Sequence, residues 1–349
     1  MVGIALLTLV PAQLGGSETY VHGLVEALAQ ERRHDYLVLA PPLAPQAGGS
    51  LPTAVATSYG RGRTIPGRLL AMASAAARPG RLRDALADAD LVHYPLTIRL
   101  PGGVHPCVTT LHDLQHLDLP NLFSRAERAF RAATWHPSVK RSDLVIVPSA
   151  FVRERAVARL GLSPERVRVV PLGVDHDVFV PSHDAREPFL LYPARPWPHK
   201  NHERLFEAFR LMRRERPDLR LVLTGGGSFP ALPDGVELLG HVHRDELVSL
   251  LQRAAALVFP SLYEGFGLPV LEAMACGCPV ACSDAASLPE LAGGAACLFD
   301  PNDAASIADG IRGVLDDPDR WRSAGLERGA AFSWSATATA TETVYGELL

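Results

Sequence analysis

Short apolar runs alternate with segments of helical periodicity along nearly the whole chain. The first run, residues 2–10, is followed by Gly15-Gly16-Ser17 and then by a segment whose apolar residues recur at i, i+3, i+4 and i+7, which predicts a strand, a tight loop and a helix. Ser149 and Gly161 are placed to begin and end a later helix. Further candidate strands in this half are residues 36–40, 91–94, 108–111, 144–147 and 167–170. Continuous apolar runs of this length are typical of a parallel sheet covered by helices on both faces.

A polar, irregular stretch near residues 175–187 interrupts this alternation and indicates a domain linker. A second series follows, with candidate strands at residues 189–192, 219–223, 236–239, 256–259, 280–282 and 297–299. The pattern predicts two doubly wound α/β domains, in which ligands bind at the carboxyl ends of the strands. We place the first domain at residues 1–178, the linker at 179–187 and the second domain at 188–332.

Length and composition support this division and limit the classes of partner. A chain of 349 residues exceeds what one hydrophobic core usually organises, and 47% hydrophobic with 21% charged residues is ordinary for a globular protein. With 34 basic and 38 acidic residues, the net charge of -4 offers no general attraction to nucleic acid, so we expect no nucleic-acid partner. An anionic ligand would need a local cluster of cations.

The apolar run at residues 2–10 is too short to span a bilayer and lacks the basic flank of a signal peptide, so we expect a cytoplasmic protein. Five cysteines are few and odd in number, which favours a reducing compartment over a disulfide framework. Their spacing matches no common zinc pattern, and we expect no metal site.

Residues 260–284, PSLYEGFGLPVLEAMACGCPVACSD, contain the most informative motif. Gly265 and Gly267 permit a tight turn, and Pro269 suits the first position of a following helix. The backbone amides of such a loop, with the positive end of the helix dipole, suit a diphosphate. Glu264 lies in the loop and Glu272 in the helix, and a carboxylate is a good acceptor for a vicinal diol.

The string EGFGLPVLE resembles the E-x7-E motif of the retaining glycosyltransferases of family 4 (group 1), which have the GT-B fold: two Rossmann-like doubly wound α/β domains facing a central cleft. The resemblance implies that Glu272 binds the ribose of a nucleotide-sugar donor and that Glu264 lies near its sugar or phosphate. It implies donor contacts also for the residues between them, namely Gly265, Phe266, Gly267 and Leu268.

Arg195 and Lys200, in YPARPWPHKNHERLFEAF, resemble the pair of cations that binds the pyrophosphate in this family. The chemistry agrees, because the leaving diphosphate gains charge as its bond to the sugar breaks, and fixed cations stabilise charge most where it develops. The interval between the two residues can vary in the family, so the assignment of Lys200 is the firmer one.

The resemblance covers nearly the whole chain. Gly15 and Gly16 resemble the family's first glycine loop over the donor phosphates, His112 in LHD resembles the histidine that contacts the transferred sugar, and Gly225 in LVLTGGG resembles a glycine-rich turn of the donor domain. Residues 333–349 resemble a terminal helix that returns to the first domain. The candidate catalytic residues are therefore His112, Arg195, Lys200 and Glu264.

These features together predict transfer of a hexose from a nucleotide-diphosphate sugar to a hydroxyl acceptor, on the front face, without metal or cofactor. The PHKNH string resembles that of mannosyltransferases that use GDP-mannose, and this resemblance makes GDP-mannose the first expected donor, with a UDP-sugar next. The acceptor stays open between a glycan, a lipid-linked molecule and a small molecule, and the oligomeric state is open as well. Alternatives are a nucleotide-sugar epimerase or phosphorylase of the same fold, or a noncatalytic nucleotide-sugar-binding partner subunit. No G-x-G-x-x-G follows the first run, which argues against a nicotinamide enzyme.

The resemblance is weakest at residues 41–83, where arginines are interspersed with apolar residues: Arg61, Arg63, Arg68, Arg78, Arg81 and Arg83. A solvated helical face in an arginine-rich chain is the interpretation we favour. The other is a docking surface for anionic lipid or a phosphorylated acceptor, with peripheral contact at the inner face of a membrane.

Overall fold

The computed structural model describes residues 1–60, 62 and 64–349, and the chain divides into two compact units. The N-terminal unit comprises residues 1–173 and 334–349, and the C-terminal unit comprises residues 174–333. The predicted linker, residues 179–187, lies within the C-terminal unit, where the Arg186 guanidinium donates hydrogen bonds to the carbonyl groups of Leu251 and Ala254.

The N-terminal unit is built on a parallel sheet that has seven strands within the described residues, in the order β3-β2-β1-β4-β5-β6-β7. Its strands are β1 (Val2–Ala5), β2 (Tyr36–Ala40), β3 (Thr53–Val55), β4 (Leu91–Tyr94), β5 (Cys107–Thr110), β6 (Leu144–Val147) and β7 (Val167–Val169). Every residue of β1, β4, β5 and β6 is buried, which explains why most of them are apolar; the exceptions are His93, Thr109 and Thr110.

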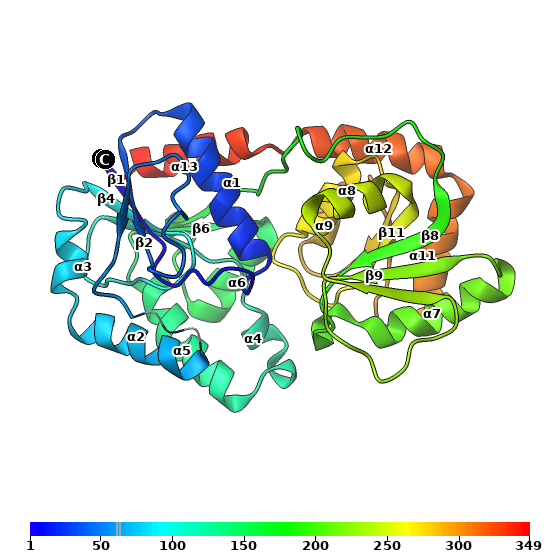
Figure 1. Ribbon diagram of the computed structural model, residues 1–349, viewed down its shortest axis with the longest axis horizontal. Coiled ribbons are helices and arrows are strands. Elements are labelled where there is room, and N and C mark those ends of the chain that lie inside the picture. Colours follow the sequence, from blue (N-terminus) through cyan, green and yellow to red (C-terminus); the bar gives the residue numbers. More distant parts are fainter. Residues whose placement is uncertain (61, 63) are drawn as a thin grey trace. The chain divides into compact units, whose positions relative to one another are not determined.

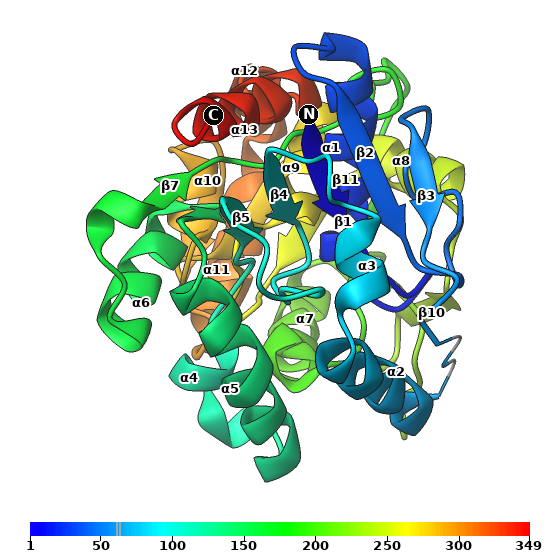
Figure 2. The same ribbon diagram turned by 90° about the vertical axis from the view of Figure 1, so that its left-hand side faces the viewer.

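Helices cover both faces of this sheet, with α1 and α13 on one side and α2, α3 and α5 on the other (Figure 2). The helices are α1 (Gly16–Glu31), α2 (Ile65–Ala77), α3 (Gly80–Asp84), α4 (Gln115–Asp118), α5 (Arg125–Lys140), α6 (Ala150–Leu160) and α13 (Trp334–Gly346), with 3-10 turns η1 (Pro120–Leu122) and η2 (Pro164–Arg166). The predicted ends of α6 are confirmed: the Ser149 side chain accepts a hydrogen bond from the Val152 amide, and Gly161 closes the helix at a φ of 67°.

Helix α13 belongs to the N-terminal unit although it follows the whole C-terminal unit in sequence, and it packs against α1 (Figure 1). A Cβ atom on Gly23 of α1 would lie 2.3 Å from the Trp334 ring, so the glycine allows this close approach. Buried hydrogen bonds join α13 to the sheet, from Tyr36 Oη to Glu342 Oε1 at 2.6 Å and between Tyr345 Oη and His93 Nδ1 at 2.7 Å.

The C-terminal unit has a parallel sheet of six strands within the described residues, in the order β10-β9-β8-β11-β12-β13. Its strands are β8 (Glu187–Pro193), β9 (Arg220–Thr224), β10 (Val236–Gly240), β11 (Ala254–Phe259), β12 (Val280–Ser283) and β13 (Cys297–Phe299). Helices α7 and α11 cover one face, and α8, α9 and α12 cover the other (Figure 1). The helices are α7 (His202–Glu215), α8 (Arg244–Arg253), α9 (Leu268–Ala275), α10 (Leu288–Ala292), α11 (Ala304–Asp316) and α12 (Pro318–Ala330), with the 3-10 turn η3 (Pro198–Lys200).

Two parallel sheets with helices on their faces confirm the predicted α/β class. Besides the position of the linker, the structure differs from the sequence prediction in two further places. The run at residues 2–10 is a strand only as far as Ala5, and its remaining apolar residues form a buried loop. Strand β3 is short, lies at the edge of the sheet and has two exposed residues, so no apolar run marks it. Within the described residues, no helix combines the length and apolar character needed to cross a membrane.

Candidate functional site

The strand order of the C-terminal unit defines where a ligand would bind. Strand β8 comes first in the chain, β9 lies on one side of it and β11 on the other, so the direction of winding reverses between β8 and β11. In doubly wound sheets the carboxyl ends of the strands at this switch point form the ligand crevice. The connection after β8 carries Arg195 and Lys200, and the connection after β11 carries Glu264.

The structure brings Lys200 and Glu264 together at this switch point. Lys200 Nζ lies 2.5 Å from Glu264 Oε1, and the two side chains are only 12% and 14% exposed. The ammonium also lies 5.1 Å from the centroid of the Phe259 ring, the last residue of β11. A largely buried ion pair of this kind keeps the ammonium in one position. Because the ammonium is mostly removed from water, its interaction with an anion is stronger than in solution.

The peptide around Lys200 is fixed by hydrogen bonds from neighbouring elements. Tyr192 Oη, from β8, donates to the Lys200 carbonyl oxygen at 2.6 Å. Asn201 begins α7 at a φ of 60°, and its side-chain amide donates to the carbonyl groups of Pro260 and Pro301. Lys200 therefore lies on a rigid turn between β8 and α7, as expected for a group that must bind a charge at a defined position.

Ser287, which directly precedes α10, holds the loop from β11 to α9 in place. Its hydroxyl lies 3.0 Å from the carbonyl oxygens of both Glu264 and Phe266. Gly267 precedes α9 at a φ of 114°, and a Cβ atom there would lie 2.7 Å from Leu288 Cδ2, so both conformation and space require glycine. The ring of Phe266 and the side chain of Leu268 are buried, so only the backbone of these two predicted donor-binding residues can face a ligand.

Glu272 lies in the second turn of α9 and is partly exposed. Burial of its carboxyl group raises its pKa from 4.5 to about 7, and the charge of Arg244 opposes this effect. No described residue forms a hydrogen bond with the carboxyl oxygens of Glu272. Such a carboxylate can accept hydrogen bonds from two hydroxyl groups of a ligand, which would replace the water it has lost.

The backbone of Gly225 lies in close contact with the peptide bond between Ala194 and Arg195. It follows β9 at a φ of 101°, and a Cβ atom there would lie 2.9 Å from the carbonyl carbon of Ala194 and 3.0 Å from the Arg195 amide nitrogen. The Gly225 backbone thus packs directly on the peptide that carries Arg195. The Arg195 guanidinium is partly exposed and lies 5.5 Å from the centroid of the Trp197 ring.

The N-terminal unit has its own cavity, of about 170 Å³, at the corresponding switch point between β1 and β4. His112 and Asp113, which follow β5, line it together with the buried loop after β1 and residues of α2. His112 Nε2 lies 2.8 Å from the Pro95 carbonyl oxygen and donates to it, and burial lowers the pKa of this histidine. The imidazole is therefore neutral near pH 7 and offers Nδ1 as an acceptor for a hydroxyl group.

Gly15 and Gly16 lie at the start of α1, between Leu14 and Ser17, both of which line this cavity. Gly15 has a φ of 57° and a ψ of -128°, a backbone conformation that glycine adopts readily, and both glycines are exposed. The structure thus places the predicted site residues in two groups, Gly15, Gly16 and His112 in the N-terminal unit and the others in the C-terminal unit.

Sequence reasoning did not identify the residues that support the site, Tyr192, Asn201 and Ser287. The residues were visible in the sequence: PHKNH contains Asn201, at the N-cap position of α7, and SLPE begins with Ser287. Their roles depend on carbonyl groups brought near by the fold, which the sequence alone does not show.

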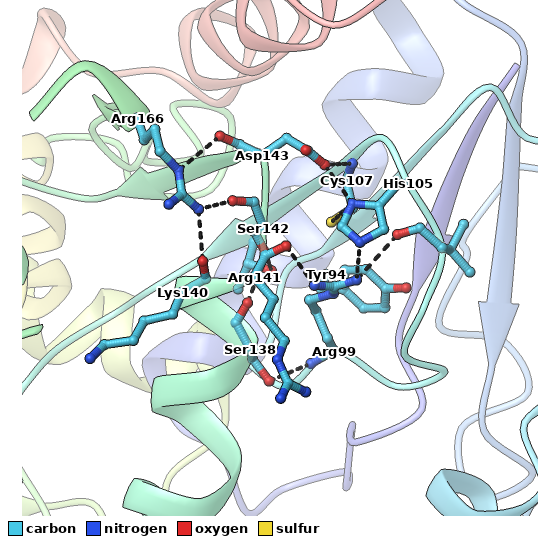
Figure 3. A network of polar contacts seen from close by, with 12 residues as sticks. Tyr94, Arg99, His105, Cys107, Ser138, Lys140, Arg141, Ser142, Asp143 and Arg166 are labelled. Atoms are coloured by element: carbon cyan, nitrogen blue, oxygen red, sulfur yellow. Dashed lines mark hydrogen bonds and ion pairs between the residues drawn. The ribbon is translucent and has the colours of Figure 1, made fainter. Parts of the chain in front are cut away.

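Among the described residues, one group of side chains has the spacing of a metal site: His105, Cys107 and Asp143 (Figure 3). His105 Nδ1 lies 2.9 Å from Asp143 Oδ2, and Arg99 Nη2 lies 3.1 Å from His105 Nε2. Because arginine can only donate, Nε2 must be the acceptor, whereas the second nitrogen of a metal-bound histidine donates. Burial also raises the pKa of the Cys107 thiol, which disfavours the thiolate. The group therefore connects the start of β5 to the turn before β6 and does not fit a metal.

Comparison with known families agrees with this geometry. Residues 175–328 match the family described as Glycosyl transferases group 1, and residues 14–178 match Glycosyltransferase Family 4. The O-antigen chain mannosyltransferase B of Escherichia coli is 32% identical over 296 residues, which cover 76% of this chain and 77% of that protein.

Solved structures match over almost the full chain. Sucrose-phosphate synthase from Thermosynechococcus elongatus aligns with a TM-score of 0.77 at 23% identity, over 99% of this chain and 98% of that one. HepE from Anabaena, solved in complex with UDP and glucose, aligns with a TM-score of 0.73 at 19% identity, over 99% of both chains. At these identities the structures show a shared fold, the two-domain GT-B architecture.

Proposed function

Because this chain belongs to the group 1 glycosyltransferases, we propose that it transfers a hexosyl residue from a nucleotide-diphosphate sugar to a hydroxyl acceptor with retention of anomeric configuration. The observation that carries the proposal is the Lys200–Glu264 ion pair at the β8/β11 switch point, beside the glycine-dependent turn into α9. Membership of this family makes the protein a glycosyltransferase, and it supports sugar transfer over the epimerase and phosphorylase alternatives.

GDP-mannose is our first candidate donor and a UDP-sugar the second. The PHKNH string and the name of the mannosyltransferase relative support mannose. The complex of HepE with UDP and glucose supports the second candidate only through the shared fold.

In the proposed reaction the acceptor hydroxyl attacks the anomeric carbon from the face on which the diphosphate leaves. The bond from carbon to the acceptor oxygen forms as the bond to the phosphate oxygen breaks. The hydroxyl proton passes to that phosphate oxygen, and the nucleoside diphosphate departs. No protein nucleophile is needed, so the two carboxylates need not act as acid and nucleophile as they do in a retaining glycosidase.

The proposal assigns a role to each residue of the candidate site. Lys200, with Arg195, stabilises the charge that develops on the leaving diphosphate. Glu264 holds the Lys200 ammonium in place. Because Lys200 binds the diphosphate in this proposal, Glu264 lies near the sugar or the phosphate next to it. Glu272 accepts hydrogen bonds from the ribose hydroxyls. His112, neutral and with a free acceptor atom, receives a hydroxyl of the transferred sugar.

We propose that no metal takes part, because two fixed cations and the helix terminus at Gly267 can carry the leaving charge. Activity retained in excess EDTA would support this step, and activity restored only by Mg²⁺ or Mn²⁺ would contradict it.

The decisive experiment measures nucleoside diphosphate release from a panel of donors, with candidate acceptors present and absent. Before the release assay, the protein is heated with GDP, UDP, ADP or dTDP, and the nucleotide that stabilises it most identifies the base of the donor. Acceptor-dependent release, with an α-linked product from an α-linked donor by NMR, is the expected result. Donor binding without turnover under any condition would favour the noncatalytic partner subunit, and an inverted product would refute retention.

A further inference from the structure

Helix α2 (Ile65–Ala77) exposes three of its four large apolar side chains, and the fourth, Met72, is partly buried. Ile65 and Leu70 are 71% and 72% exposed, and Leu69 is 44% exposed. The buried residues of the helix are the small Ala71 and Ala75, which pack on the core of the N-terminal unit. A surface helix usually has the opposite arrangement, with large apolar residues facing the core.

The segment of the chain that contains α2 carries charges of one sign. From residue 36 to residue 83 the sequence contains no Asp or Glu, although it contains all six arginines of the basic stretch. Arg78 and Arg81, just beyond α2, are exposed and form no ion pair within the part of the chain that the structure describes. Asp84 ends the stretch at the close of α3. Arg61 and Arg63 lie outside the described residues.

Helix α2 lies at the periphery of the N-terminal unit in both views (Figures 1 and 2). Its other side forms part of the cavity wall through Arg68, Ala71 and Met72, and His112 lies in the same cavity. Arg68 is fixed by a hydrogen bond of 2.9 Å from Nη1 to Gln13 Oε1. One helix therefore separates the cavity from the exposed apolar face.

We propose that α2 and the arginines that follow it form a docking surface for an anionic lipid bilayer. Ile65, Leu69 and Leu70 enter the boundary between headgroups and acyl chains, and Arg78 and Arg81 bind the negative surface, which is the arrangement of an interfacial amphipathic helix. A second copy of this chain is disfavoured as the occupant, because a symmetric contact would bring the same arginines together.

The test is flotation of the full chain with lipid vesicles. It requires neither donor nor acceptor, so its outcome does not depend on the proposed transfer reaction. Vesicles of phosphatidylcholine alone are compared with vesicles of equal parts phosphatidylcholine and phosphatidylglycerol. We expect binding to the anionic vesicles only, and its loss in about 1 M NaCl, where the Debye length is about 3 Å. No binding to the anionic vesicles at low salt would overturn the proposal.

Two double variants separate the charged from the apolar contribution. An arginine near an anionic surface contributes about fivefold to binding, so Arg78→Ser with Arg81→Ser should weaken it about 25-fold. Ile65→Ser with Leu70→Ser should weaken it at least about tenfold. These side chains are exposed, and an unchanged thermal midpoint would show that the fold is retained.

Arg210→Ser with Arg214→Ser on α7 is the matched control, since both arginines are exposed and the variant removes the same charge far from α2 in sequence. An equal loss in the control, or unchanged binding in the Ile65/Leu70 variant, would refute the proposal. A shift of the Ile65/Leu70 variant from dimer to monomer on gel filtration would also refute it and identify a second copy as the occupant.

Discussion

Glu272→Gln should stabilise the protein at neutral pH while it weakens donor binding. In the folded protein, burial raises the pKa of this carboxyl group from 4.5 to about 7. The folded state therefore keeps the proton over a pH range in which the unfolded chain has lost it. The stabilising contribution of the wild-type carboxyl group is complete below pH 4.5 and is lost as the pH rises through 7.

The magnitude follows from the two pKa values. The interval from 4.5 to about 7 corresponds to at most about 3.5 kcal/mol, at about 1.4 kcal/mol per pKa unit. Glutamine has nearly the same shape and does not titrate. The stability of the variant relative to wild type should therefore increase between pH 4.5 and 7 and become constant above that range.

The assay is the unfolding midpoint of both proteins from pH 5 to 8.5, together with calorimetry of nucleoside diphosphate binding. For a unit of this size, 1 kcal/mol shifts the midpoint by about 2 to 4 °C. We expect wild-type affinity to fall below pH 7, as Glu272 becomes protonated, and the variant to bind more weakly with less dependence on pH. Parallel stability profiles would refute the buried-carboxylate reasoning, and equal affinities at pH 8 would refute the ribose role.

Three further substitutions test the geometry of the site. Lys200→Ala should lower donor affinity or turnover at least about tenfold in steady-state kinetics, and an unaltered rate in this variant would contradict the leaving-group assignment. Adding Glu264→Gln should restore thermal stability but not activity, because it removes the carboxylate that Lys200→Ala leaves without its cation. Gly267→Ala should lower the unfolding free energy by about 1–3 kcal/mol and abolish nucleotide binding, whereas Gly294→Ala, at a φ of 88° in open space, should cost less. Ser287→Ala should reduce kcat more than it raises the KM for donor, since the single hydroxyl proton of Ser287 lies within reach of the Glu264 and Phe266 carbonyl oxygens and helps to hold the loop. Normal kinetics would show that the loop keeps its position without this hydroxyl.

The fold was largely predictable because the strands of a parallel sheet covered on both faces are buried and therefore consist mostly of apolar residues. The exceptions have the same cause. The loop at residues 6–10 is as buried as a strand, so its apolar pattern wrongly predicts a strand there. Strand β3, by contrast, is exposed at the sheet edge and has no apolar run. Burial determines the pattern, and it coincides with strand structure in most of the chain but not in all of it.

The sequence indicates candidate site residues but does not indicate their contacts. The motif EGFGLPVLE marks Glu264 and Glu272, yet the ion pair of Glu264 with Lys200 spans 64 positions and exists because β11 lies beside β8. The pKa of Glu272 depends on how deeply α9 buries its second turn, which the spacing of residues does not reveal. Pairing and burial arise from the assembled sheet, so they require the structure.

The return of α13 to the N-terminal unit has a consequence for how the chain is made. The C-terminal unit is an insertion whose two ends pair with each other, since Val174 and Ser333 form a parallel bridge. During synthesis it can fold as soon as it leaves the ribosome, while the N-terminal unit still lacks the helix that supplies Tyr345 to the buried His93 and Glu342 to Tyr36. The half that is translated first is thus completed last, and deleting α13 would damage the N-terminal unit while residues 174–333 could still fold as a separate domain.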